Sequence, residues 1–210
     1  MTMKKNINLP NRLTIARFLM VPVFLIVMFA IPAKYWIVRN AVGAAIFLAA
    51  SITDAVDGHV ARKYNLITDF GKFLDPLADK CIVISAMTMI LYHFENIKPY
   101  FVWVFVIVLL REFAITGLRL IISNKGVVLA AATLGKIKTV FQMVFIMTTL
   151  LEPILYFVIG LIFPIPAGVN AFLAAYPPLT LISMAGTLLF TVWSCIDYFR
   201  GGGKYIDPEK

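Results

Sequence analysis

Six long apolar runs dominate this sequence, and they constrain its fold more than any other feature. Each run is close to the roughly 20 residues that a helix needs to cross the hydrocarbon core of a bilayer. The predicted spans are approximately residues 13–33, 36–57, 73–94, 100–123, 135–163 and 177–200. The runs are continuous, whereas the strands of a transmembrane β-barrel alternate polar and apolar residues. We therefore expect an all-α membrane protein with six transmembrane helices.

The overall composition agrees with this fold class. Of the 210 residues, 61% are hydrophobic and 14% are charged. A soluble domain is about 45–50% apolar and 25% charged, so a cytosolic enzyme, a disulfide scaffold and a disordered chain are all disfavoured. Six spans leave little chain for a separate soluble domain. We expect a single membrane domain over residues 1–210.

The segment before the first span has a different pattern. Residues 6–17 interleave apolar and polar side chains, which is typical of a short amphipathic helix in the membrane interface. Pro10 would mark its start or a break in it. The basic residues ahead of the apolar run 18–33 resemble a signal peptide, but the run is long for one and further spans follow. We expect a retained first helix.

The distribution of lysine and arginine predicts the orientation. With a cytoplasmic N-terminus, 16 of the 19 basic residues fall on the cytoplasmic side, and Lys34, Arg39 and Lys98 fall on the other. The positive-inside rule then places both termini in the cytoplasm and the chain in the cell membrane. The net charge of +8 is explained by topology and anionic lipid head groups, so no nucleic-acid partner is expected. Aromatic residues near span ends, Tyr198 among them, are typical of an aromatic belt.

Four aspartates gather where the second span ends and the third begins. Asp54 and Asp57 are three residues apart, and Asp75 and Asp79 are four apart. Each spacing places a pair on one helix face, and a short loop lets the two faces oppose each other. The sequence therefore predicts four carboxylates that converge just inside the membrane.

Such a cluster needs compensation. Four unpaired intramembrane carboxylates would cost about 10 kcal/mol on the insertion scale, and repulsion between like charges adds to this. One or two divalent cations would remove the cost, and all-oxygen ligands favour Mg²⁺, Mn²⁺ or Ca²⁺. The alternative is a set of solvated carboxylates neutralised by Arg62, Lys72 and Lys80.

Small residues lie between the acids. Gly58 directly follows Asp57 and would let a flat or bulky group approach the helix backbone, and Ala61 keeps that groove open. Arg62 offers a planar fork suited to phosphate oxygens. Gly71 precedes the second acid pair. Small residues alone are common in membrane helix packing, but their combination with acids on both sides is specific.

These eight residues form the pattern D-x2-D-G-x2-A-R-x8-G-x3-D-x3-D across 26 positions. The pattern resembles that of the CDP-alcohol phosphatidyltransferases at every fixed position. Flanking segments are similar to the bacterial branch of the family whose acceptor is glycerol 3-phosphate. These segments are residues 10–17, Arg111-Glu112 with Gly117 to Arg119, and residues 135–139.

The resemblance implies a six-helix membrane enzyme, usually a homodimer, with a cytoplasm-facing site that holds two divalent cations, Mg²⁺ or Mn²⁺. Such enzymes join CDP-diacylglycerol to sn-glycerol 3-phosphate and release CMP. The motif positions then take roles as follows. Asp54, Asp57 and Asp75 correspond to metal ligands, Asp79 to the catalytic base and a further metal contact, and Asp54, Gly58, Ala61, Arg62 and Gly71 to the nucleotide and diphosphate site.

The phosphate of the acceptor requires positive charge nearby. Arg119 and Lys136 are the first candidates, followed by Arg111 and Lys138. Glu112 lies seven residues before Arg119 on nearly the same helix face, so an ion pair between them is the alternative. Asn11, Thr14 and Arg17 are candidates for lining the site, with helix capping or lipid head-group contacts as an equal alternative.

Three other functions fit parts of the pattern. A cation transporter would spread its acids at mid-depth over several spans. A Mg²⁺-dependent membrane prenyltransferase would not need the Gly-x-x-Ala-Arg element. Within the family, the acceptor alcohol could be serine or inositol phosphate. The sequence suggests no function for Glu152, an isolated acid beside Pro153.

Overall fold

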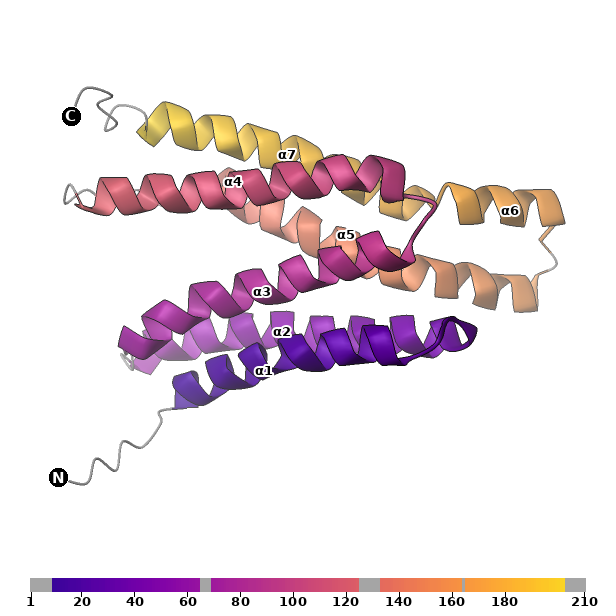
Figure 1. Ribbon diagram of the computed structural model, residues 1–210, viewed down its shortest axis with the longest axis horizontal. Helices are drawn as coiled ribbons and strands as arrows, with labels where there is room; N and C mark the ends of the chain where they lie inside the picture. Colours follow the sequence, from indigo (N-terminus) through magenta and orange to yellow (C-terminus); the bar gives the residue numbers. More distant parts are fainter. Residues whose placement is uncertain (1–8, 65–68, 125–132, 164, 203–210) are drawn as a thin grey trace. The chain divides into compact units, whose positions relative to one another are not determined.

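The computed structural model describes the backbone of residues 9–64, 69–124, 133–163 and 165–202, and the side chains of residues 14–53, 77–123, 133–163 and 165–202. The chain divides into two compact units, Met1–Tyr92 and His93–Lys210. Every element in the described ranges is a helix (Figure 1). The predicted all-α class is confirmed.

Unit 1 contains α1 (Leu9–Ala30), the short 3-10 helix η1 (Ala33–Tyr35), α2 (Trp36–Tyr64) and α3 (Asp69–His93). Helices α1 and α2 form a hairpin through η1 and pack along each other. A Cβ on Gly43 of α2 would lie only 2.8 Å from the sulfur of Met28 on α1, so the glycine permits this close approach.

Helix α1 begins earlier than the predicted span. It starts at Leu9, and Pro10 lies in its first turn, where a missing N–H costs little. Its apolar part is Thr14–Ala30. The predicted amphipathic segment is therefore continuous with the first span over the described backbone, and its place in the membrane interface stays a prediction.

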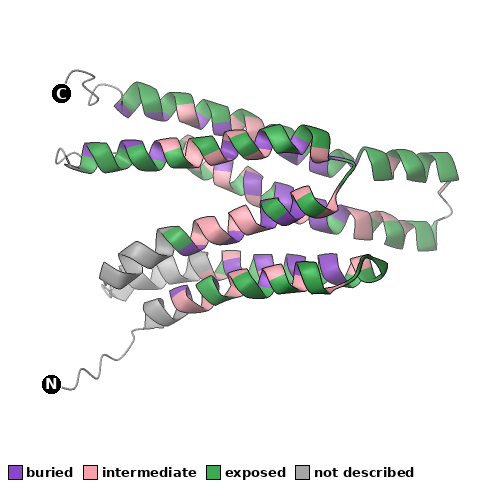
Figure 2. Ribbon diagram, in the orientation of Figure 1, coloured by how far each residue is buried: buried purple, intermediate pink, exposed green. Residues whose placement is uncertain are grey.

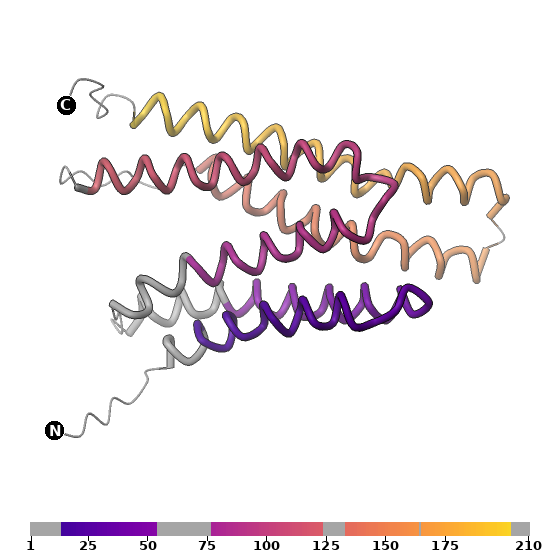
Figure 3. The backbone as a smooth tube through the Cα atoms, viewed as in Figure 1, coloured from indigo at the N-terminus to yellow at the C-terminus, as the bar shows by residue number. Residues whose placement is uncertain are grey.

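Unit 2 contains α4 (Lys98–Asn124), α5 (Thr133–Ile162), α6 (Ala167–Ala175) and α7 (Pro178–Gly202). Helix α7 packs against both α4 and α5. At one point the approach of α5 and α7 is especially close, because a Cβ on Gly186 would overlap the ring of Phe141. The end of α4, the start of α5 and the end of α7 therefore belong to one end of this bundle (Figure 3).

The six long helices match the six predicted spans, and α6 is the addition. It forms from residues Ala167–Ala175, between Pro166 at its N-cap and Tyr176 at its C-cap. The side-chain amide of Asn96 donates to the carbonyl oxygen of Ala174 at 2.9 Å and ties this short helix to the turn before α4. Pro166 precedes the helix and Pro177 follows Tyr176, so a proline on each side limits its length.

The surface of each unit is that of a membrane protein. Large apolar side chains are exposed on every long helix, with Trp103 and Phe113 each 70% exposed, whereas a row of hydroxyl side chains on α7 is buried. Figure 2 shows buried and exposed positions alternating along the helices. Within the described residues, four segments are long and apolar enough to span a bilayer, and the apolar part of α1 is shorter. Exposed apolar surface on this scale fits lipid rather than water. The chain is a multi-pass membrane protein.

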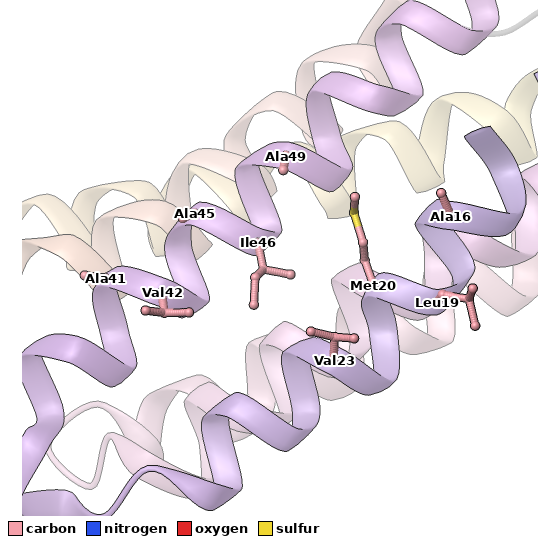
Figure 4. A pocket seen from close by; sticks show the side chains of 9 residues that line it. All are labelled: Ala16, Leu19, Met20, Val23, Ala41, Val42, Ala45, Ile46 and Ala49. Carbon is pink, nitrogen blue, oxygen red and sulfur yellow. The ribbon is translucent and has the colours of Figure 1, made fainter. Parts of the chain in front are cut away.

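A shallow apolar groove lies between α1 and α2 (Figure 4). Its volume is about 750 Å³, and residues such as Met20, Val23 and Ile46 line it. Small side chains at Ala41, Ala45 and Ala49 form part of its α2 wall. Since all of its lining is apolar, the groove suits hydrocarbon rather than a polar substrate.

Candidate functional site

The motif aspartates lie on two consecutive helices of unit 1. Asp54 and Asp57 belong to α2, and Asp75 and Asp79 belong to α3. Both pairs therefore lie on helical backbone, as the prediction that each pair shares one helix face requires. Asp79 is half-buried. The side chains of the other motif residues lie outside the described ones; these are Asp54, Asp57, Gly58, Ala61, Arg62, Gly71 and Asp75.

The metal-ligand assignments therefore stay predictions. Among the described side chains, no group of three or more histidine, cysteine, aspartate or glutamate residues could hold a metal ion. Three of the four motif aspartates fall outside that set. Of the predicted lining residues, Thr14 and Arg17 are each 1% exposed on α1, and the side chain of Asn11 is also outside the described part.

The second group of predicted site residues forms a charged cluster in unit 2. We call it the α4–α7 cluster. Its members are Arg111, Glu112 and Arg119 on α4, Lys138 on α5, and Ser194 and Tyr198 on α7. Three helices bring these side chains together in one half of the bundle. The cluster extends from the middle of α4 toward the end at which α4 and α7 finish and α5 begins.

Glu112 is the anionic centre of the cluster. Its Oε1 atom lies 2.8 Å from Nη1 of Arg111 and 2.7 Å from Nζ of Lys138. Lys138 is only 3% exposed. Arg111 also donates its Nε–H to the hydroxyl of Ser194 at 3.2 Å. Both cations are thus held by fixed partners, and Glu112 offsets part of their charge.

Arg119 is held differently. It is exposed, and its Nη2–H donates to the hydroxyl oxygen of Tyr198. The centre of the Arg119 guanidinium lies 5.1 Å from the centroid of the Tyr198 ring, and that of Arg111 lies 5.8 Å from it. Both distances are in the range of cation–π contacts. One buried aromatic ring therefore contacts two guanidinium groups.

The alternative ion pair between Glu112 and Arg119 is absent. Both side chains are described, and Glu112 contacts Arg111 and Lys138 instead. Seven residues of α-helix separate Glu112 from Arg119 by about 10 Å along the axis. Two nearer cations are therefore better partners for the carboxylate.

The remaining candidate cation and a neighbouring glycine lie on α5. Lys136 is exposed, and no carboxylate in the described part of the chain lies within ion-pair distance of it. A Cβ on Gly135 would sit 3.5 Å from Nη2 of Arg111 and 3.7 Å from the Tyr198 ring. The start of α5 therefore borders the cluster, and glycine leaves space beside both groups.

The cluster carries excess positive charge. Among the described residues, its three cations, Arg111, Arg119 and Lys138, and its one carboxylate, Glu112, give a net charge of 3 − 1 = +2. Charges in a partly buried site are screened less than at an open surface. Excess positive charge favours anionic ligands, and the guanidinium fork suits phosphate oxygens in particular.

Ser194 and Tyr198 belong to the cluster but are not among the site residues predicted from sequence. Tyr198 was assigned to the aromatic belt, although it is only 5% exposed. A signal was present in the spacing of Thr187, Thr191, Ser194 and Tyr198, which recur every three or four residues along one helix face. A hydroxyl row on an otherwise apolar helix indicates a face turned toward protein rather than lipid.

The comparisons with known proteins agree on one family. The family model of the CDP-alcohol phosphatidyltransferases matches residues 7–193. A CDP-diacylglycerol–glycerol-3-phosphate 3-phosphatidyltransferase of Bacillus subtilis (strain 168) is 46% identical over 153 residues, which cover 69% of this chain and 77% of the relative.

Two further relatives carry the same name. The protein of Rickettsia typhi is 42% identical over 136 residues, covering 65% of this chain and 72% of its own length. That of Wigglesworthia glossinidia brevipalpis is 34% identical over 174 residues, covering 80% and 91%. The match extends through the aspartate motif and the α4–α7 cluster except for Ser194 and Tyr198, which follow its last residue. The chain belongs to the CDP-alcohol phosphatidyltransferase family.

Proposed function

We propose that this chain transfers the phosphatidyl group of CDP-diacylglycerol to sn-glycerol 3-phosphate. The products are phosphatidylglycerophosphate and CMP, and the reaction is the committed step toward phosphatidylglycerol. Relatives named for this reaction support the choice. The observation that carries it is the net positive α4–α7 cluster, since this acceptor differs from a neutral alcohol by its phosphate.

Asp54, Asp57, Asp75 and Asp79 would hold two divalent cations, Mg²⁺ or Mn²⁺. A donor set made only of carboxylate oxygens fits hard cations of this kind. When bound, the cations neutralise the negative charge that develops on the diphosphate as CMP leaves. Gly58, Ala61, Arg62 and Gly71 would form the remainder of the nucleotide and diphosphate site.

Asp79 would act as the general base. Its carboxylate takes the proton from the primary hydroxyl of glycerol 3-phosphate as that oxygen attacks the lipid-linked phosphorus. A new P–O bond forms to the acceptor, and the P–O bond to the CMP leaving group breaks. The half-buried position of Asp79 on α3 supports this role, since a base must be reachable by substrate.

The acceptor phosphate would bind to cations of unit 2. Arg119 and Lys136 are exposed, and each lacks a carboxylate partner within the described residues. Arg111 and Lys138 share Glu112 and so contribute less unbalanced charge. Arg119 and Lys136 would therefore contact the phosphate directly, while Arg111 and Lys138 would shape the site and add to its potential.

The proposal also covers the orientation of the enzyme in the membrane, its domain structure and its assembly. Both termini and the site would face the cytoplasm, because the positive-inside rule favours that orientation. A single membrane domain over residues 1–210 is expected, and the family match over residues 7–193 supports it. A homodimer is the expected assembly, as the family resemblance implies.

Turnover with a panel of acceptors tests the reaction. Purified protein in detergent is given radiolabelled CDP-diacylglycerol and glycerol 3-phosphate, serine or inositol phosphate in turn. We expect divalent-dependent transfer to glycerol 3-phosphate with the highest kcat/KM. Inositol phosphate is the nearest rival, because the same cations would bind its phosphate. A preference for either other acceptor would replace the proposed function.

Substitution of Asp79 tests the division of labour among the aspartates. Asp79→Asn keeps the shape of the side chain but cannot accept the proton, so turnover should fall by about 10²–10⁴. Binding of CDP-diacylglycerol should survive in this variant and be weakened in Asp54→Ala. Glu95→Gln is a matched control, since Glu95 is an exposed acid outside the motif. If Asp79→Asn loses lipid binding as fully as Asp54→Ala, Asp79 is chiefly a metal ligand.

A further inference from the structure

Tyr198 is the one member of the α4–α7 cluster that contacts two of its arginines. It is 5% exposed, its hydroxyl accepts an N–H from Arg119, and its ring lies within 6 Å of the centres of both guanidinium groups. A buried side chain on a packed helix occupies one rotamer, so its hydroxyl and ring present a fixed surface.

The partner of each arginine decides how much charge remains for a ligand. Arg111 contacts the carboxylate of Glu112, which offsets its charge. Arg119 contacts a phenol, which holds the guanidinium without neutralising it. An aromatic ring and a hydroxyl can therefore fix a cation in place and leave its full charge for an anion.

We propose that Tyr198 is a positioning residue that presents Arg119 to the phosphate of the acceptor. This role rests on the proposed function, which assigns that phosphate to the cations of unit 2. The ligand class is a phosphate monoester, and the guanidinium N–H groups of Arg119 that do not face Tyr198 would bind its oxygens. Tyr198 itself contacts the arginine and not the substrate.

Two substitutions separate the hydroxyl from the ring. Tyr198→Phe removes the hydrogen bond to Arg119 and keeps the aromatic face, whereas Tyr198→Leu removes both. The matched control is Phe199→Leu, because Phe199 is the neighbouring aromatic residue on α7 and is 44% exposed. It belongs to no part of the cluster.

Steady-state kinetics with CDP-diacylglycerol and glycerol 3-phosphate give the first readout. We expect the KM for glycerol 3-phosphate to rise about tenfold in Tyr198→Leu and about threefold in Tyr198→Phe, as charge-assisted hydrogen bonding and the cation–π contacts are lost. The KM for CDP-diacylglycerol and kcat should stay within about twofold. If Tyr198 had a purely structural role, its substitution would lower kcat and stability without a selective rise in the KM for glycerol 3-phosphate. Tyr198→Phe would then not have a KM between those of the wild type and Tyr198→Leu.

Equilibrium binding gives the second readout and does not depend on turnover. Radiolabelled glycerol 3-phosphate and inorganic phosphate are each titrated onto the full-length protein and its variants in detergent. Weaker binding of both ligands in the order wild type, Tyr198→Phe, Tyr198→Leu supports the role, even if the acceptor panel selects another phosphorylated alcohol. Equal affinities in all three proteins, or no binding of either ligand to the wild type, would overturn it.

Discussion

Glu112 and Glu152, two glutamates within the long helices of unit 2, have charges that are compensated in different ways. Glu112 on α4 is paired with two cations, Arg111 and Lys138. Glu152 on α5 is 2% exposed and receives its hydrogen bonds from neutral groups. The hydroxyl of Tyr156 and the backbone N–H of Leu179 donate to its Oε1 at 2.7 and 2.9 Å. The backbone N–H and hydroxyl of Thr180 donate to its Oε2, each at 2.7 Å.

The neutral partners of Glu152 explain its presence in an apolar helix. Leu179 and Thr180 lie in the first turn of α7, where backbone N–H groups have no partner within the helix. A carboxylate from the neighbouring helix satisfies them, and the positive end of the helix dipole stabilises its charge. Glu152 is thus a cap supplied by α5 to α7, and the bonds fix where α7 begins.

Under the proposed function, Glu152 is a structural anion and Glu112 is an anion of the acceptor site. At Glu152 every observed donor is neutral, so the cap contributes no positive charge that could attract a phosphate. Around Glu112 the described cations outnumber the carboxylate. Positive charge therefore remains in the half of the bundle where α7 finishes and α5 begins. Loss of Glu152 should therefore affect stability, and loss of Glu112 should affect both stability and acceptor binding.

The largest effect is expected from Glu112→Gln. The substitution leaves the buried Lys138 and the adjacent Arg111 without this carboxylate, and breaking such a pair costs about 3–5 kcal/mol. We expect a lower thermal unfolding midpoint together with a reduced kcat/KM for glycerol 3-phosphate. Thermal unfolding in detergent and steady-state kinetics measure the two effects. An unchanged midpoint would mean that the pair is solvated and contributes little.

A smaller and more selective effect is expected from Glu152→Gln. The amide keeps the size of the side chain but places an NH₂ group against donors, so about 2 kcal/mol of stability should be lost. The KM for glycerol 3-phosphate and that for CDP-diacylglycerol should match the wild type when both are measured well below the unfolding midpoint. A rise in either KM would show that the cap also sets the geometry of the site.

The two glutamates also show what sequence can predict here. The six long helices follow from apolar runs, and the family follows from eight residues within 26 positions, since both are local signals. The function of Glu152 was not predictable in this way, because the groups that it caps lie 27 and 28 residues away on α7. Tyr198 was missed for the same reason: it lies 79 residues after Arg119.

The candidate cations illustrate the limit more finely. Sequence selected Arg111, Arg119, Lys136 and Lys138 as a group, but charge and spacing alone could not separate those that share a carboxylate from those that do not. That distinction depends on which side chains reach Glu112 across three helices. The roles of the motif aspartates stay predictions, because their assignment rests on the pattern and on the family.

The smallest effect is expected from Ser194→Ala, which tests how finely Arg111 must be held. Ser194 is fully buried, and its hydroxyl accepts the Nε–H of Arg111 at 3.2 Å while donating to the carbonyl of Thr191 at 3.1 Å. Alanine removes one of the two hydrogen bonds described for the Arg111 side chain and leaves the bond to Glu112 and the contact with the Tyr198 ring. A single hydrogen bond of this kind contributes about 1 kcal/mol, so the KM for glycerol 3-phosphate should rise by no more than about fivefold.

Ser123→Ala is the control, since Ser123 is exposed near the end of α4 and bonds only the carbonyl of Leu120 among the described residues. A loss as large as that of Glu112→Gln would mean that the position of Arg111, rather than the summed charge of the cluster, governs acceptor binding.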